Sequence, residues 1–210
     1  MNHLIESLMS VAPMVIVALT AVIVMLAIAI KRSHFWSATL TVIGLNAALI
    51  TLIAQAFGVL PSGAPNMLFV VDGFAVFNIA IILIASLACC TLAYGYFQTL
   101  TDNKDELYLL MLISTLGAML MACATHLASF FMALELLSVP MYGMLAYAFM
   151  RSRSLESGLK YLVLSATASA TLLMGMAFIF ADTGVLGFKE LGLALVHGQA
   201  SMWFALGAIT

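Results

Sequence analysis

A single acidic residue, Glu135, lies in an apolar run from Leu127 to Met150 that holds no other formal charge. Placing a charged side chain at the centre of a bilayer costs on the order of 2.5–3.5 kcal/mol on insertion scales. Such residues therefore usually face protein or trapped water and mark proton or ion paths. The chemistry open to one isolated carboxylate is the uptake and release of a proton. The alternative is a protonated glutamate that only ties helices together by a hydrogen bond.

The residues that follow Glu135 in the sequence favour a hydrated helix face. Pro140 has no N–H, so it leaves the carbonyl of Leu136 without its helical donor. Ser138 and Tyr142 fall on the same helical face as Glu135. A carboxylate, two hydroxyls and a freed carbonyl can together hold water. At about 1.5 Å per residue, Glu135 would lie about 12 Å from the outer end of its helix and about 22 Å from the inner end.

Lys160 is the second unusual charge, about 9 Å inside the next helix if that helix begins near Ser154. One interpretation is a favourable i,i+4 ion pair with Glu156, with the lysine side chain extended toward the headgroups. The other is a proton-loading site, because a partly desolvated lysine releases its proton more readily and regains it when a carboxylate approaches. At about 4 Å and an effective dielectric near 20, such a pair interacts by about 4 kcal/mol, enough to change a protonation state.

The remaining polar residues of the apolar segments favour structural roles. His126 lies at the outer start of the Glu135 helix, where it could cap the helix or take part in a proton relay. The stretch "SATASAT" (165–171) is a small-residue face suited to close helix packing more than to lining a channel. Asn46, Gln55 and Asn78 are expected to form hydrogen bonds between helices.

The composition indicates that lipid, and not water, surrounds most of this chain. Hydrophobic residues make up 65% of the 210 residues and charged residues only 8%, which predicts an all-α protein that crosses the membrane several times. A soluble chain of this length could not cover so much apolar surface. Cys89, Cys90 and Cys123 lie in apolar segments without CxxC spacing, so we expect small buried side chains and neither a metal site nor a disulfide.

About 20 apolar residues are needed for each crossing. On this basis the sequence predicts six complete transmembrane helices, near residues 8–30, 35–57, 74–97, 107–124, 127–149 and 155–181. An amphipathic stretch at 188–198 is expected to lie along the interface. The final run, 202–210, is about half a spanning length, so we expect the start of a seventh helix and a chain that is the N-terminal portion of a longer protein.

Basic residues predict the orientation. Alternate connections contain five of them, whereas the opposite connections contain only Lys189. The five are Lys31, Arg32, Lys104, Arg151 and Arg153. Because basic loops stay in the cytoplasm, these connections are expected to face the cytoplasm, with the N-terminus outside.

Three stretches together resemble one family: "DNKDELYLLMLI" (102–113), "HLASFFMALELLSVPMYG" (126–143) and "RSRSLESGLKYLVLSATASA" (151–170). They are similar to the antiporter-like membrane-arm subunits of proton-pumping NADH:quinone oxidoreductase, respiratory complex I. The resemblance covers essentially the whole chain, including "VIGLNAAL" (42–49) and "VDGF" (71–74). A glutamate shortly before Ser-x-Pro, followed by a basic loop and a lysine early in the next helix, is its most specific part.

This resemblance implies an antiporter-like helix bundle of about fourteen helices with two inverted repeats, each with a broken helix. It divides the chain into N-terminal helices one to three (1–106) and an incomplete first repeat (107–210). Glu135 and Lys160 match the family's proton-transferring glutamate and lysine, with five supporting residues: Ser138, Pro140, Tyr142, His126 and Glu156. The family's further charges, in helices seven, eight and twelve, have no counterpart in this sequence.

The implied function is proton translocation in a membrane-arm subunit, coupled to quinone reduction in partner subunits. No cofactor is expected in this chain; NADH, flavin, iron–sulfur clusters and quinone would be held by partners. The expected surroundings are the other membrane-arm subunits and the lipid of a bacterial inner membrane, with no nucleic acid. Two alternatives remain: a subunit of a multi-subunit cation/proton antiporter or membrane-bound hydrogenase, and a structural subunit that does not pump.

Overall fold

The computed structural model describes residues 9–58, 68–97, 105–147, 152–196 and 207. These residues form helices connected by short segments, and contain isolated β-bridges but no strand. The helices are α2 (Ala12–Ile30), α3 (His34–Ala56), α4 (Gly73–Phe97), α5 (Asp105–Ala122), α6 (Leu127–Ala146), α7 (Ser152–Thr183) and α8 (Phe188–Val196).

Six of these helices, α2 to α7, are long and apolar enough to cross a membrane. They coincide with the six spans expected from the sequence, which confirms the all-α, multi-pass fold class. The ends differ by a few residues. The first span begins at Ala12 with a proline in its first turn, and the last runs from Ser152 to Thr183. The amphipathic stretch after α7 forms α8, whereas most of 202–210 lies outside the described residues.

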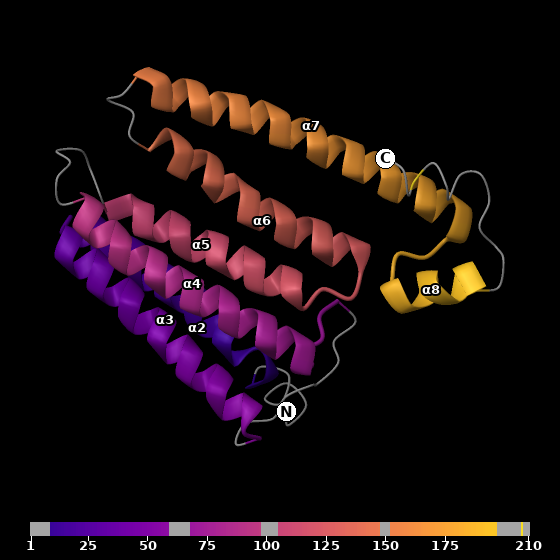
Figure 1. Cartoon of the computed structure of the whole chain (residues 1–210), viewed down its shortest axis with the longest axis horizontal. Helices are drawn as coiled ribbons and strands as arrows, with labels where there is room; N and C mark the ends of the chain where they lie inside the picture. The colour runs from indigo at the N-terminus through magenta and orange to yellow at the C-terminus, as the bar shows by residue number, and fades with distance from the viewer. Residues whose placement is uncertain (1–8, 59–67, 98–104, 148–151, 197–206, 208–210) are drawn as a thin grey trace.

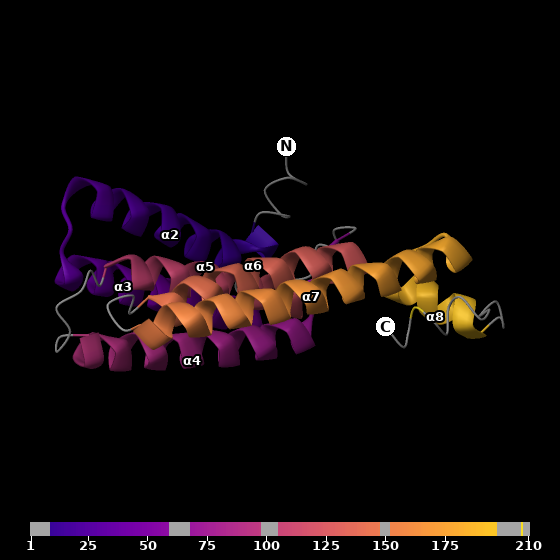
Figure 2. The same ribbon diagram turned by 90° about the horizontal axis from the view of Figure 1, so that it is seen from above.

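Four helices, α2 to α5, share one apolar core, and α6 and α7 extend from it in a row (Figure 1). Each of the four contributes fully buried residues, such as Val17, Leu45, Ile79 and Leu112. Figure 2 shows α2 and α4 on opposite sides of α5. Within the described residues this core includes none from α6 or α7. Helix α6 therefore packs between α5 on one side and α7 on the other.

Glycines let α6 approach both of its neighbours closely. A Cβ atom at Gly117 of α5 would lie 2.5 Å from the backbone nitrogen of Leu137. On the other side, a Cβ at Gly158 of α7 would lie 2.7 Å from the Cβ of Ala146. Helices that meet through small residues can place backbone against backbone, which is the usual way that membrane helices gain packing energy.

The beginning of α6 is fixed by backbone hydrogen bonds on both sides of the α5–α6 connection. On one side, the Val70 N–H donates to the Cys123 carbonyl at 2.9 Å. On the other, the Phe188 N–H donates to the Thr125 carbonyl at 3.0 Å. The connection is thus held between the segment that precedes α4 and the first residue of α8.

The end of α2 and the start of α3 lie at the same end of the molecule as the end of α6 and the start of α7 (Figure 1). We call this the basic end, because Lys31, Arg32 and Arg153 lie next to or within these helix ends in the sequence. There the Arg32 guanidinium pairs with Glu106 at 3.2 Å, and the Tyr147 hydroxyl donates to the same carboxylate at 3.0 Å. Burial raises the pKa of the Tyr147 hydroxyl, and the hydrogen bond to Glu106 raises it further, so this group stays protonated and remains a donor.

Two of the three expected interhelical amides are corrected by the structure. Gln55 donates to the carbonyls of Met9 and Ser10 at 2.7 and 3.1 Å, so it does connect separate segments. Asn46 and Asn78 instead donate to carbonyls four residues earlier in their own helices, at 2.8 Å each. They lie on outward faces, where the nearest acceptor is the carbonyl of the preceding turn.

The cysteines also divide by helix face. All three are free thiols; Cys90 and Cys123 are buried as expected, whereas Cys89 is exposed. Adjacent residues on a helix point about 100° apart, so Cys90 can face the core while its neighbour faces outward.

Candidate functional site

Glu135 lies near the middle of α6 and faces α7. It is about 12 Å from the first residue of the helix and about 17 Å from the last, at 1.5 Å per residue. Its side chain is half-buried, and its Oε1 accepts a hydrogen bond from the Ser169 hydroxyl of α7. A carboxylate near the centre of a spanning helix thus has a polar partner on the neighbouring helix.

A second hydrogen bond joins the same two helices nearer the basic end. The Tyr142 hydroxyl donates to the Ser165 hydroxyl at 2.8 Å. Tyr142 lies two turns after Glu135 on α6, and Ser165 lies one turn before Ser169 on the antiparallel α7. We call these four residues, Glu135, Tyr142, Ser165 and Ser169, the α6–α7 seam. The Tyr142 ring also packs against that of Tyr161, with ring centroids 5.6 Å apart.

Ser138 and Pro140 are both buried, and both affect the backbone hydrogen bonds of α6. The Ser138 hydroxyl donates to the backbone carbonyl of Glu135 at 3.3 Å, so it contacts the residue but not its carboxylate. Helix α6 continues through Pro140 to Ala146 without a break. From α5, the Ser114 hydroxyl donates to the Leu137 carbonyl at 3.4 Å, in the turn preceding the proline. This turn of α6 is therefore supported by side chains on both helices.

Glu135 also lines a groove of about 400 Å³ between α5 and α6. The other lining residues are apolar: Leu110 and Ile113 of α5, and four residues of α6 around the glutamate. Glu135 therefore lies between a hydroxyl donor on α7 and an apolar groove along α5.

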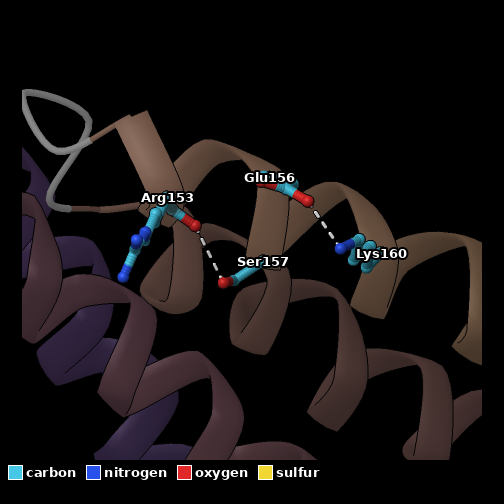
Figure 3. Close-up of polar contacts among 4 residues, drawn as sticks. All are labelled: Arg153, Glu156, Ser157 and Lys160. Atoms are coloured by element: carbon cyan, nitrogen blue, oxygen red, sulfur yellow. Dashed lines mark hydrogen bonds and ion pairs between the residues drawn. The ribbon is translucent and has the colours of Figure 1, made fainter.

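Lys160 lies on α7, away from the part of that helix that contacts Glu135. Its Nζ donates to Glu156 Oε1 at 2.5 Å, which confirms the predicted i,i+4 ion pair (Figure 3). Both side chains are mainly exposed in this chain, at 71% and 61%. In the described part of the chain no hydrogen bond or ion pair joins Lys160 to Glu135. Ser169, the partner of Glu135, lies nine residues further along α7, or about 13 Å.

His126 is the N-cap of α6, as the capping interpretation predicted. Its Nδ1 accepts a hydrogen bond from the Ala128 N–H at 3.2 Å, and its carbonyl accepts one from the Ser129 hydroxyl at 2.8 Å. Ser154 lies in the first turn of α7, near the expected start of that helix. Its hydroxyl donates to the Leu145 carbonyl at 2.8 Å and so connects α7 to the end of α6.

The sequence interpretation missed Ser165 and Ser169 as polar partners. It assigned the whole stretch from 165 to 171 to close packing. The available signal was their i,i+4 spacing, which places both serines on one face of α7. Thr167 and Thr171 lie on the exposed faces and donate to carbonyls of their own helix.

Residues 124–210, which include Glu135, the seam and Lys160, match a family model described as NADH:quinone oxidoreductase/Mrp antiporter, transmembrane. Over 99% of its length the chain is 58% identical to NADH-quinone oxidoreductase subunit N of Psychrobacter arcticus, covering 43% of that protein. The C-terminal part of the chain is thus similar to this family, and the chain as a whole is similar to subunit N. A second relative, NADH-quinone oxidoreductase subunit N of Acinetobacter baumannii, is 56% identical over 88% of the chain and 37% of its own length.

Solved structures of larger membrane complexes contain chains with a similar fold. Respiratory complex I from Thermus thermophilus contains a chain with a TM-score of 0.70 and 27% identity, which matches 93% of this chain and 42% of its own. A chain of the archaeal membrane-bound sulfane sulfur reductase has a TM-score of 0.73 over 97% of this chain and 42% of its own, but at 20% identity it shows the fold alone. The chain spans less than half the length of these relatives.

Proposed function

We propose that this chain forms part of a proton-translocating membrane-arm subunit of a bacterial NADH:quinone oxidoreductase, equivalent to subunit N. The observation that carries the proposal is the Glu135 carboxylate, held near the middle of a spanning helix between the Ser169 hydroxyl and an apolar groove. The 58% identity to subunit N over nearly the whole chain supports the assignment to this complex.

In this function Glu135 accepts a proton and releases it again. The Ser169 hydroxyl can donate or accept a hydrogen bond, and it holds the Glu135 side chain beside the apolar groove near the middle of the spanning helix. Lys160 acts as the second proton-transfer residue, and its ammonium group is paired with Glu156. Ser138, Pro140, Tyr142 and His126 support the helix that carries Glu135.

Electron transfer and quinone reduction belong to partner subunits in this proposal. NADH, flavin, iron–sulfur clusters and quinone would be bound there, and this chain would carry no redox cofactor.

The boundary between the N-terminal helices and the first repeat falls between residues 106 and 107 in this proposal. Helix α5 lies after this boundary but shares its apolar core with α2 to α4. The boundary therefore divides the chain by repeat and does not divide its apolar core.

The basic end faces the cytoplasm and the N-terminus faces the periplasm in this proposal. Support comes from Arg32 and Arg153, which lie at the same end of the molecule, whereas Lys189 lies on α8 at the opposite end (Figure 1).

The alternatives are a subunit of a multi-subunit cation/proton antiporter or membrane-bound hydrogenase, and a structural subunit that does not pump. The relatives with 56–58% identity bear the name of subunit N, which favours the oxidoreductase over the first alternative. The second is decided by experiment.

The test is Glu135→Gln in the assembled complex, because glutamine keeps the size of the side chain and removes its charge. Expected are normal assembly and a loss of proton pumping and coupled quinone reductase activity, measured with NADH in inverted membrane vesicles. Glu135→Asp should be intermediate. Glu190→Gln, the same chemical change on exposed α8, is the matched control. If Glu135→Gln complexes pumped like those of Glu190→Gln, Glu135 would be only a structural hydrogen-bonding residue.

A further inference from the structure

Among the described residues, one polar side chain of α7, that of Ser169, forms a hydrogen bond with Glu135. Helix α7 packs on α6 through a narrow face that includes Gly158, Ser165 and Ser169, and most of its other residues are exposed. On that face, Ser169 is the residue whose hydroxyl reaches the carboxylate of Glu135.

The hydroxyl groups of residues 165 to 171 divide according to the face of α7 on which they lie. Ser165 and Ser169 bond to side chains of α6. Thr167 and Thr171 donate to carbonyls one turn earlier in α7, where exposed hydroxyls of spanning helices usually bond. The bond from Ser169 to Glu135 is therefore a specific interhelical contact and not a general property of this small-residue stretch.

We propose that Ser169 is a positioning residue for Glu135. A serine hydroxyl can both donate and accept. It can therefore donate to the charged carboxylate, and it can accept from the protonated acid after rotating about one bond. The same contact holds the Glu135 side chain in place in both protonation states. The Tyr142–Ser165 bond, one turn of α7 nearer the basic end, keeps the two helices in the register that brings Ser169 to Glu135.

This inference rests on the proposed function of Glu135, and it is tested in the assembled complex with four variants. Ser169→Ala removes the hydroxyl, Ser169→Thr keeps it, Thr167→Ala removes a hydroxyl that faces away from α6, and Glu135→Gln provides the reference. Two quantities are measured per assembled complex: the NADH-driven proton-pumping rate in inverted vesicles, and the carboxylic C=O band of Glu135 in redox-induced infrared difference spectra, identified by its absence in Glu135→Gln.

Expected for Ser169→Ala is a pumping rate about threefold to tenfold lower, in the range that loss of one ordinary hydrogen bond produces, and a displaced infrared band. Ser169→Thr should restore both, and Thr167→Ala should change neither. Adding Ser169→Ala to Glu135→Gln should lower pumping no further, because residues that act as a unit are not additive.

The inference fails if Ser169→Ala matches Thr167→Ala in rate and band position while Glu135→Gln has lost pumping; the proposed function would then stand alone. If Glu135→Gln also pumps normally, the proposed function itself is wrong. A lower yield of the Ser169→Ala complex with an unchanged band per complex would show a purely structural serine and would also overturn the inference.

Discussion

Substituting Gly117 by alanine should separate α5 from α6 at the turn next to Glu135. An added Cβ would lie 2.5 Å from the Leu137 backbone nitrogen and 2.8 Å from both the Leu136 carbonyl carbon and the Leu137 Cα. These are backbone atoms, which cannot rotate away as a side chain could. To reach an ordinary contact distance the helices must move apart by about 1 Å, and overpacking of this kind costs about 1–3 kcal/mol.

The displacement should affect pumping more than assembly. Helix α6 is also bonded to α7 through the seam, so movement of α6 away from α5 strains the contacts of Glu135 and Tyr142. A shift of about 1 Å in a reacting group can lower a rate by as much as about 10²-fold. We expect Gly117→Ala to give an assembled complex with a lower denaturation temperature and pumping reduced by at least about tenfold.

The matched control is Gly95→Ala on α4, where an added Cβ meets nothing within 4 Å. Alanine is the better helix former by about 1 kcal/mol, so this variant should be neutral or slightly more stable. Both variants are compared by native gel electrophoresis, by thermal denaturation of the solubilised complex and by proton pumping in vesicles. If Gly117→Ala were as stable and as active as Gly95→Ala, the close α5–α6 contact would not position Glu135.

Three further predictions concern other parts of the chain. Lys160→Arg should retain more pumping than Lys160→Ala but less than the unaltered protein, because arginine keeps its proton throughout the physiological range; full equivalence of arginine and lysine would contradict a titrating role. Gly184→Ala should destabilise the end of α7 by about 1–2 kcal/mol, since Gly184 has a φ of +70° and its N–H donates to the Phe180 carbonyl, whereas Gly192→Ala on α8 should not. In a variant without native cysteines, Ser33→Cys should react with membrane-impermeant thiol reagents from the cytoplasmic side and Lys189→Cys from the opposite side; the reverse pattern would invert the proposed orientation.

The spans were predictable because a bilayer imposes one dominant constraint, about 20 apolar residues per crossing. Contacts within one helix were also predictable, because they depend on sequence spacing alone. The Lys160–Glu156 pair depends only on i,i+4 spacing, and the capping role of His126 depends only on its place before α6. In each case the relevant partner lies within one turn of the same helix or at its end.

Contacts between helices were less predictable, because they depend on which face of each helix meets which neighbour. Asn46 and Asn78 were expected to bond between helices, yet they lie on outward faces and bond within their own turns. Ser165 and Ser169 were expected only to allow close packing, yet they face α6 and bond to it. The helical period shows which residues share a face of a helix. Which neighbouring helix that face meets depends on how the helices pack, and a single sequence does not specify this.

The same distinction separates the two proton-transfer candidates. The surroundings of Glu135 are supplied by this chain: Ser169 on one side, and on the other a groove whose walls belong to α5 and α6. Lys160 lies on a face of α7 where Leu159, Val163 and Leu164 are also exposed. Because a charge is costly beside lipid, the surroundings of Lys160 depend on its distance from the headgroups and on whatever packs against α7. Variants of Glu135, Ser169 and Gly117 therefore test contacts made within this chain. Variants of Lys160 instead test contacts that the neighbouring subunits and the lipid make with α7 in the assembled membrane arm.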